Sequence, residues 1–296
     1  MRSLAFYNTA TNPIHQQLII SFADKVGIDI TQSKEYKECD VAVIFGSWKK
    51  QSKKDYKASR APHHKLKNDI INNHIGKVIV FETPLLNRTI TQNHESYRVG
   101  LNHFMRGLAD FKNHNSTPDR FNSMGIDIKS WRKKGEHVLL VGQNMNDASL
   151  FGLNFEWWVE NTIRMLLKNT ERPIVVRDHP ENKELLKNVV ADRFGYTKQV
   201  IYDTNEHIKD SLQNAHCTVS YTSGSSVDSL IAGVPVITCC EYNFLWPISS
   251  HSLADVDSPL LADNTVRKQL LYDLAWTQWS VNEIKEGKPW EHLIEN

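Results

Sequence analysis

Short apolar runs alternate with segments of helical spacing along most of this chain. Apolar side chains at Ile14, Leu18 and Phe22 recur at the spacing of one helix face. Runs rich in β-branched and aromatic residues flank that segment, and such runs predict strands. The alternation favours an α/β fold in which helices cover both faces of a parallel sheet. In the first half, the predicted strands are 3–8, 28–30, 40–45 and 77–81, and a further helix is predicted at 66–75.

A polar stretch from about residue 113 to residue 135 separates this half from a second alternating series. The closing segment 264–285 is predicted as one helix, with Trp276 and Trp279 as packing residues. Between the polar stretch and the closing segment, the predicted strands are 137–142, 173–179, 197–203, 217–221 and 234–239, and the predicted helices are 154–168, 206–215 and 225–232.

Two consecutive Rossmann-like domains are the simplest account of this order. We predict a doubly wound N-terminal domain over residues 1–130 and a second one over 131–263. A C-terminal helix over 264–296 is expected to brace the first domain. Because ligands of open α/β sheets bind beyond the carboxyl ends of the strands, the expected site is a cleft between the two domains.

The composition is that of an ordinary globular protein, with 296 residues, 40% of them hydrophobic and 23% charged. No apolar run is long enough to cross a membrane, and the first residues turn polar too quickly for a secretory signal. None of the four cysteines forms a Cys-x-x-Cys pair, so they indicate small core residues in a reducing compartment. We therefore expect a cytoplasmic protein without membrane contact.

The strongest chemical signal is a serine-rich turn between a predicted strand and a predicted helix. It contains Ser223, Gly224, Ser225 and Ser226. Hydroxyls and unpaired backbone N–H groups at such a point bind anions, and Gly224 lets a phosphate approach the backbone. The alternative is an ordinary serine cap. The apolar sequence at 230–237, Leu-Ile-Ala-Gly-Val-Pro-Val-Ile, favours a nucleotide phosphate site.

A second signal follows the predicted strand 173–179. Arg177 and His179 alternate at its carboxyl end, so both side chains can face one side, and Pro180 fixes the exit of the chain. Two such groups could neutralise a phosphate leaving group. The alternative is a surface histidine held by loop backbone.

Together, the two segments resemble GT-B glycosyltransferases over residues 137–240. The His179-Pro180 and Ser225-Ser226 pairs are similar to the His-Pro and Ser-Ser motifs of bacterial sialyltransferases and capsule Kdo transferases. The resemblance implies a CMP- or UDP-linked sugar donor, with the first pair at the nucleotide and the second at its phosphate. Asp228 stands where many GT-B enzymes carry a ribose-binding Glu.

The turn at Gly142-Gln143 resembles the glycine-containing turn that approaches the donor in GT-B folds, although a tight βα loop would have the same sequence. The single Asp-x-Asp, at 255–257, follows no predicted strand and is read as a solvated loop. We therefore expect no metal ion in the site, in contrast to enzymes that hold a divalent ion on such a motif.

Candidates for the catalytic base lie in the first half. Glu82 directly follows the predicted strand 77–81, where a carboxylate could deprotonate an acceptor hydroxyl. Asp110 is a second candidate. Either could instead be a salt-bridged surface acid.

The segment 49–67 carries seven lysines and one arginine against one acid, Asp55, although the whole chain has a net charge of only +1. Such a segment beside an acceptor cleft suits a nucleic-acid backbone, with aromatic side chains available to stack on bases. A solvated lysine-rich loop is the alternative. The predicted DNA-binding residues are Trp48, Lys49, Lys50, Lys53, Lys54 and Arg60.

In general character the chain also resembles phage-encoded glycosyltransferases that add a sugar to hydroxymethylated pyrimidines in DNA, including hydroxymethylcytosine. This resemblance implies a base flipped into the cleft and a sugar transferred to its hydroxymethyl oxygen. Three alternatives stay open. The acceptor could be a surface polysaccharide or lipopolysaccharide, the enzyme could be a nucleotide-sugar epimerase, or the chain could bind nucleic acid without catalysis.

Overall fold

The computed structural model divides into two compact units, Met1–Ser123 with Leu271–Asn296 (unit 1) and Met124–Leu270 (unit 2). The chain therefore passes from one unit to the other twice. Among the described residues, no helix combines the length and the apolar character needed to span a bilayer. The structure describes residues 4–7, 10, 12–26, 30–33, 35–46, 62–89, 93–145, 147–182, 184–195 and 197–295.

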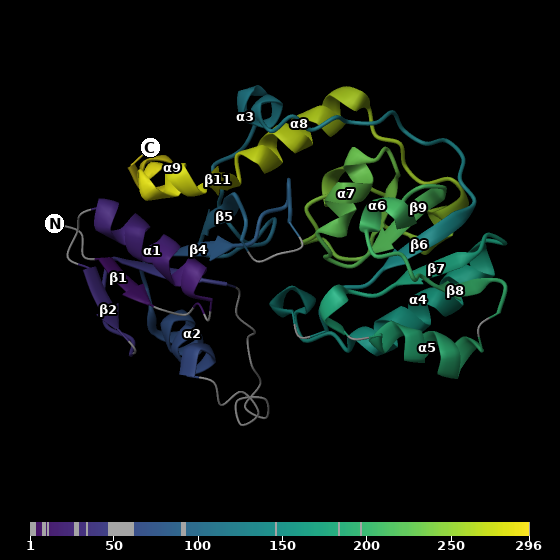
Figure 1. Cartoon of the computed structure of the whole chain (residues 1–296), viewed down its shortest axis with the longest axis horizontal. Helices are drawn as coiled ribbons and strands as arrows, with labels where there is room; N and C mark the ends of the chain where they lie inside the picture. The colour runs from purple at the N-terminus through teal and green to yellow at the C-terminus, as the bar shows by residue number, and fades with distance from the viewer. Residues whose placement is uncertain are drawn as a thin grey trace. The chain divides into compact units, whose positions relative to one another are not determined.

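Unit 1 contains a six-stranded sheet in the order β11-β5-β4-β3-β1-β2 (Figure 1). The strands β2, β1, β3 and β4 are parallel, which confirms the predicted α/β alternation. The strand β5 is antiparallel to β4 and was not predicted, and β11 is antiparallel to β5. The bounds are β1 Leu4–Tyr7, β2 Ile30–Ser33, β3 Val41–Phe45, β4 Lys77–Glu82, β5 Ser96–Leu101 and β11 Gln278–Ser280.

The core of unit 1 lies between this sheet and the helix α1 (Pro13–Val26). Leu18 and Phe22 of α1 are buried, as their spacing predicts, whereas Ile14 is 46% exposed. Residues from the C-terminal end of the chain, including Ile284 and Leu293, belong to the same core. Figure 1 shows these yellow helices beside α1. The other helices of unit 1 are α2 Pro62–Asn73, α3 Asp119–Ser123, α9 Val281–Lys285, α10 Lys288–Trp290 and the π-helix η6 Glu291–Glu295.

The prediction of a single helix over 264–285 is wrong. The helix α8 (Asn264–Ala275) ends, the strand β11 pairs with β5, and α9 begins after Ser280. Ser280 and Glu283 form a capping box that starts α9. The Gln278 side chain accepts hydrogen bonds from the N–H groups of Leu85 and Leu86 at 3.1 and 3.0 Å. These long-range bonds override the local helical pattern.

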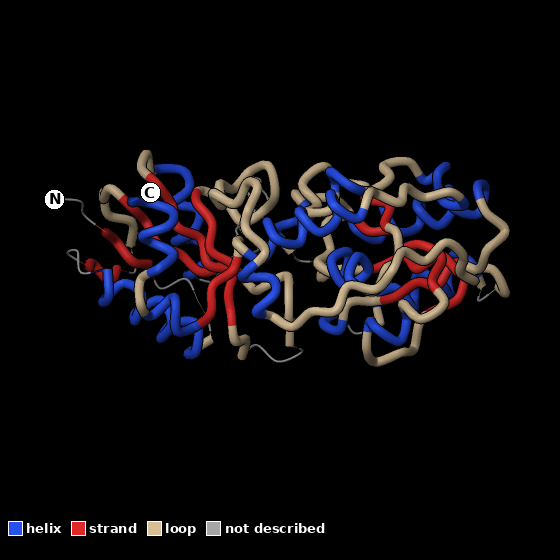
Figure 2. The backbone as a smooth tube through the Cα atoms, turned by 90° about the horizontal axis from the view of Figure 1, so that it is seen from above, coloured by secondary structure: helices blue, strands red, loops and turns tan. Residues whose placement is uncertain are grey.

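Unit 2 contains a five-stranded, fully parallel sheet in the order β10-β9-β6-β7-β8. Figure 2 shows strands in red and helices in blue. Its strands are nearly continuous apolar runs because helices cover both faces. The bounds are β6 His137–Val141, β7 Ile174–Arg177, β8 Val200–Tyr202, β9 Ala215–Ser220, β10 Val236–Thr238, α4 Phe155–Asn169, α5 Leu185–Phe194, α6 Ile208–Ser211 and α7 Ser225–Ile231, with 3₁₀ turns η2 Ala148–Leu150, η3 Pro180–Asn182, η4 Trp246–Ile248 and η5 Leu253–Asp257.

The two predicted packing tryptophans enclose an arginine. The Arg120 guanidinium lies 4.6 Å from the ring centre of Trp276 and 4.2 Å from that of Trp279, and donates to both carboxylate oxygens of Glu283. Trp279 is only 3% exposed, whereas Trp276 is half-buried. Trp279 therefore contributes the larger share of the buried aromatic surface.

We expect Trp279→Ala to lower the free energy of unfolding by about 3–5 kcal/mol, as loss of a large buried aromatic side chain does. Trp276→Ala should cost less, because part of its ring is already in water. Urea unfolding followed by far-UV circular dichroism measures both. Trp157→Ala is the control, since Trp157 is 60% exposed. An equal or larger loss for Trp276→Ala would contradict this assignment.

Candidate functional site

Three of the predicted site segments follow three neighbouring strands of unit 2. Ser223–Ser226 follows β9, Gly142 follows β6 and His179 follows β7, and β6 lies between the other two. Because the strands are parallel, all three segments lie at the carboxyl edge of one sheet. With strands about 4.8 Å apart, the ends of β9 and β7 are about 10 Å from each other, which is within the span of one nucleotide.

Gly142 is required by the close approach of the loops after β6 and β7. A Cβ atom at this position would lie 2.7 Å from the Arg177 carbonyl oxygen and 3.3 Å from the His179 nitrogen. The Gly142 N–H donates to that same carbonyl at 2.7 Å. A side chain here would push the two loops apart.

Gln143 ties the loop after β6 to the serine-rich turn after β9. Its side-chain oxygen accepts from the Thr222 N–H at 3.0 Å, and its nitrogen donates to the hydroxyls of Thr222 and Ser149 at 2.9 and 3.0 Å. Gln143 is only 3% exposed. Its amide is thus engaged by protein groups, so its role is to hold the turn in place.

The two serines of the Ser-Ser pair have different environments. The Ser226 side chain is fully buried, where its hydroxyl donates to the Ser223 carbonyl at 2.6 Å and accepts from Asn243 at 3.0 Å. Ser225 is half-buried, and within the described residues its hydroxyl has no hydrogen-bond partner. Gly224 has φ −60°, a conformation open to any residue. Ser225 is therefore the member of the pair that can contact a ligand.

Asp228 lies three residues after Ser225 on α7. Both are half-buried, whereas the residues between and after them, Ser226, Val227 and Ser229, are buried. Positions three apart share one helix face. Asp228 is therefore on the same outward face as Ser225.

Arg177 occupies an internal position. Its guanidinium donates to Asp203 and Ser211 at 2.9 Å each, and to the carbonyls of Asn205 and Glu206 at 2.7 and 2.8 Å. Only 8% of the residue is exposed. These bonds order the segment after β8. The Arg177 side chain is therefore not available to join His179 at a ligand, contrary to what the alternation of the two residues predicted.

Asp178 was not predicted, although it lies between two predicted residues. Its carboxylate accepts from the His179 N–H at 3.0 Å, from the Asn182 side chain at 2.9 Å and from the Leu186 N–H, at the start of α5, at 2.7 Å. It fixes the turn that Pro180 begins. Because Asp178 is not the residue next to α5, the usual N-cap signal could not have identified it.

The same turn sets the tautomer of His179. Its Nδ1 accepts the Glu181 N–H at 3.2 Å. In the neutral ring the proton then resides on Nε2, which makes Nε2 a hydrogen-bond donor. The side chain is half-buried at the carboxyl edge.

In unit 1, Glu82 ends β4 at the carboxyl edge of that sheet and is half-buried. Its Oε1 accepts from the Thr83 N–H at 2.8 Å. The nearby Lys67 is only 7% exposed, and burial lowers its pKa to about 8, although the Glu82 carboxylate acts in the opposite direction. Arg98, 6% exposed, lies opposite Glu82 in the β4–β5 register. Two basic residues, Lys67 and Arg98, therefore lie near Glu82, which sequence reasoning did not foresee.

Asp110 lies elsewhere in unit 1. It bridges to Leu101, which pairs with Ile79 near the start of β4, and its Oδ1 accepts from the Lys112 N–H at 2.9 Å. Asp110 is exposed and holds a turn. Asp110 therefore lies at the amino edge of β4, away from Glu82. It cannot share a site with Glu82 at the carboxyl edge.

The predicted DNA-binding residues, Trp48, Lys49, Lys50, Lys53, Lys54 and Arg60, all lie outside the described residues. The end of the basic segment is described, and there Lys65 is exposed on α2 whereas Lys67 is buried. Lys67 therefore does not belong to a solvated basic surface.

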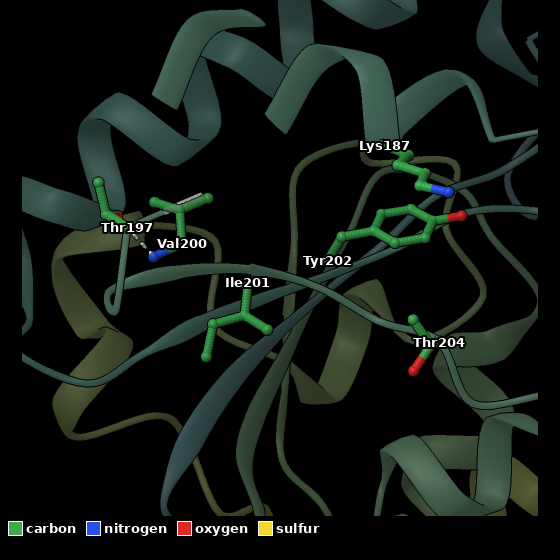
Figure 3. Close-up of a pocket in the computed structure, with 6 residues that line it drawn as sticks. All are labelled: Lys187, Thr197, Val200, Ile201, Tyr202 and Thr204. Atoms are coloured by element: carbon green, nitrogen blue, oxygen red, sulfur yellow. Dashed lines mark hydrogen bonds between the residues drawn. The ribbon is translucent and has the colours of Figure 1, made fainter. Parts of the chain in front are cut away.

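A depression of about 370 Å³ lies at the β8 edge of unit 2 (Figure 3). The side chains of Lys187 and Tyr202 extend to one end of it. β8 is separated from β9 by two strands, so this depression is distinct from the segments described above. It is lined by Lys187, Thr197, Val200, Ile201, Tyr202 and Thr204.

The Asp-x-Asp at 255–257 lies on the 3₁₀ turn η5. Asp257 accepts from Thr170 at 2.7 Å and from Arg172. Within the described part of the chain, no group of three or more His, Cys, Asp or Glu side chains is arranged to hold a metal ion.

The solved structures that share the fold of this chain include two Kdo transferases. The Thermosulfurimonas dismutans KpsC beta Kdo 2,4 transferase has a TM-score of 0.56 and 13% identity, with 93% of this chain and 90% of that one covered. The beta Kdo 2,7 transferase of the same organism's KpsC has a TM-score of 0.52 and 14% identity, with 96% and 98% covered. No family model and no curated protein matches this sequence. At 13–14% identity, the similarity shows that the α/β fold is shared.

The different environments of Ser225 and Ser226 predict different effects on stability. Ser226→Ala should lower the free energy of unfolding by about 1–3 kcal/mol, because it leaves the buried Asn243 amide short of an acceptor. Ser225→Ala should change it by less than about 0.5 kcal/mol. Thermal unfolding of the two variants side by side tests this, and equal losses would show that the serines are wrongly assigned.

Proposed function

We propose that this protein is a glycosyltransferase that moves a sugar from a nucleotide-sugar donor to an acceptor hydroxyl. The proposal is carried by the observation that Ser225, Gly142 and His179 follow three adjacent parallel strands of unit 2, at the carboxyl edge of the sheet. The fold shared with two Kdo transferases supports it. A GT-B arrangement, with the acceptor held by the N-terminal domain, is part of the proposal.

In this proposal, the Ser225 hydroxyl binds the donor phosphate. The first N–H groups of α7 already donate within the turn, to Ser223 and Gly224. α7 has only seven residues, so direct hydrogen bonds, more than a helix dipole, provide the attraction. His179 Nε2 donates to the same nucleotide from the β7 side, and Asp228 accepts from the ribose. Arg177, Gln143 and Ser226 position these groups, and Pro180 fixes the turn. The donor is a CMP- or UDP-sugar.

The reaction needs a base and a stabilised leaving group. The acceptor oxygen forms a bond to the anomeric carbon as the bond from that carbon to the phosphate oxygen breaks, and the acceptor proton passes to a base. We propose Glu82 as that base. The negative charge on the departing nucleotide is stabilised by Ser225 and His179, so we expect transfer without a metal ion.

The proposed acceptor is DNA that carries a 5-hydroxymethylpyrimidine, as in phage genomes. The basic segment 49–67 supports this choice, because phosphate contacts by Lys and Arg dominate DNA affinity. The second candidate acceptor is a sugar hydroxyl of a surface polysaccharide or lipopolysaccharide. The fold shared with Kdo transferases favours this second candidate.

Two variants should separate donor binding from catalysis. His179→Ala should weaken nucleotide binding about tenfold or more and reduce transfer, because a charge-assisted hydrogen bond to phosphate is lost. Glu82→Gln should keep nucleotide binding and reduce transfer about 10²–10⁴-fold. Calorimetry measures binding of CMP and UDP. Mass spectrometry measures transfer from a panel of nucleotide sugars to hydroxymethylated DNA or to oligosaccharides, with and without EDTA.

The wild-type protein should bind at least one of the nucleotides and label at least one acceptor, and EDTA should leave the labelling intact. If no nucleotide or nucleotide sugar binds, the glycosyltransferase proposal fails. If Glu82→Gln transfers sugar at the wild-type rate, another group is the base.

Replacing Lys49, Lys50, Lys53 and Lys54 by Ala tests the DNA acceptor. Each lost phosphate contact removes about one unit from the slope of log affinity against log salt, so the variant should have a slope shallower by about 3–4. Gel-shift titrations with hydroxymethylated duplex DNA measure this slope. Nucleotide binding should not change.

A matched control removes the same charge from unit 2, by changing four of its exposed lysines, Lys133, Lys134, Lys168 and Lys198, to Ala. That variant should keep the wild-type slope. Equal slopes for both variants and the wild type, or no DNA shift at all, would eliminate DNA as the acceptor and leave the oligosaccharide.

A further inference from the structure

Two aromatic rings lie together beside the serine-rich turn. The rings of Phe151 and Tyr242 have centroids 4.9 Å apart and are inclined at 49° to each other. Phe151 follows β6 and η2, and Tyr242 follows β10. Phe151 is 44% exposed and Tyr242 is half-buried, so the pair lies at the surface of unit 2.

The backbone of Phe151 is strained. Its φ of 51° and ψ of 32° lie in the left-handed region, which favours glycine and asparagine and which bulky residues rarely adopt. The conformation ends the 3₁₀ turn η2, where the Phe151 N–H donates to the Ala148 carbonyl, and the residue is 44% exposed. Residues held in sparsely populated conformations are frequent at ligand sites.

Two hydrogen bonds place the pair next to the proposed phosphate site. The Ser149 carbonyl, two residues before Phe151, accepts from the Thr222 hydroxyl at 3.1 Å. Asn243, the neighbour of Tyr242, donates to Ser226 at 3.0 Å. Each ring therefore belongs to a residue that is one or two positions along the chain from a residue hydrogen-bonded to Thr222 or Ser226.

The position of the pair along the sheet edge is opposite to that of His179. β10 is the neighbour of β9 on the side away from β6 and β7. Tyr242 belongs to the loop after β10, and Phe151 contacts it from the loop after β6. A nucleotide sugar extends from its phosphate in two directions. With the nucleoside toward β7, the sugar extends toward the two rings.

We propose that Phe151 and Tyr242 form a stacking platform for the donor's sugar ring. This inference rests on the proposed function. The face of an aromatic ring is electronegative and attracts the C–H groups of a sugar face. The two rings, with centroids 4.9 Å apart, contact each other, so the sugar ring would stack on the exposed part of Phe151 with Tyr242 at its side. The Tyr242 hydroxyl adds a polar group for sugar hydroxyls.

The test compares the nucleotide with the nucleotide sugar on the same variants. Calorimetry is run with CMP and UDP alone and with CMP-N-acetylneuraminate, UDP-glucose and UDP-N-acetylglucosamine, using whichever pair binds the wild type. Phe151→Asn and Tyr242→Ala should each weaken binding of the nucleotide sugar about 3- to 10-fold and leave binding of the nucleotide within about twofold. Ile201→Ala is the matched control, since Ile201 is 42% exposed on the far edge strand β8.

Thermal unfolding distinguishes a ligand contact from a structural role. Asn adopts the left-handed conformation easily, so Phe151→Asn should keep or raise the melting temperature. A lower melting temperature together with equal weakening of nucleotide and nucleotide sugar would overturn the inference, as would unchanged affinity for both. If the wild type binds a nucleotide but no nucleotide sugar, the platform is wrong and the nucleotide site stands. If it binds neither, the proposed function fails as well.

Discussion

The buried hydrogen bonds of Gln143 hold the carboxyl edge of unit 2 in one arrangement. Its side chain joins the loop after β6 to Thr222 after β9 and to Ser149 of η2, and its carbonyl accepts from Asn182 after β7. The loops after three adjacent strands are therefore linked through one residue. An amide with this many buried partners is costly to disturb, because each partner would lose its hydrogen bond away from water. The proposed ligand contacts depend on this link.

The polar residues of this edge divide into a set that supports the loops and a set that we propose contacts the ligand. Arg177 is bound to Asp203, and Asp178 caps α5 and holds the turn at His179, so both charges serve the scaffold. Ser226 is buried in the same way. Ser225 and His179 remain at the surface of the edge. A site whose contacting groups are fixed by a second set of hydrogen bonds is preorganised for a charged ligand.

The sequence predicted the strands of both sheets well where burial on both faces makes them continuous apolar runs, as in β6 and β9. It failed at β11, because a three-residue strand formed by long-range pairing with β5 carries no local signal. Motif position identified the edge that carries Ser225 and His179. It could not tell Ser225 from Ser226, or Arg177 from His179, because burial and hydrogen-bond partners depend on residues far along the chain.

The most direct test of the central claim is hydrogen–deuterium exchange of the full chain with and without saturating CMP or UDP. The account predicts slower amide exchange in peptides that cover 142–151, 178–182 and 221–230, at the carboxyl edge of unit 2, and no change in peptides that cover β4 and α2. Protection centred on 187–204, around the depression lined by Lys187 and Tyr202, with no change at the serine-rich turn, would contradict it.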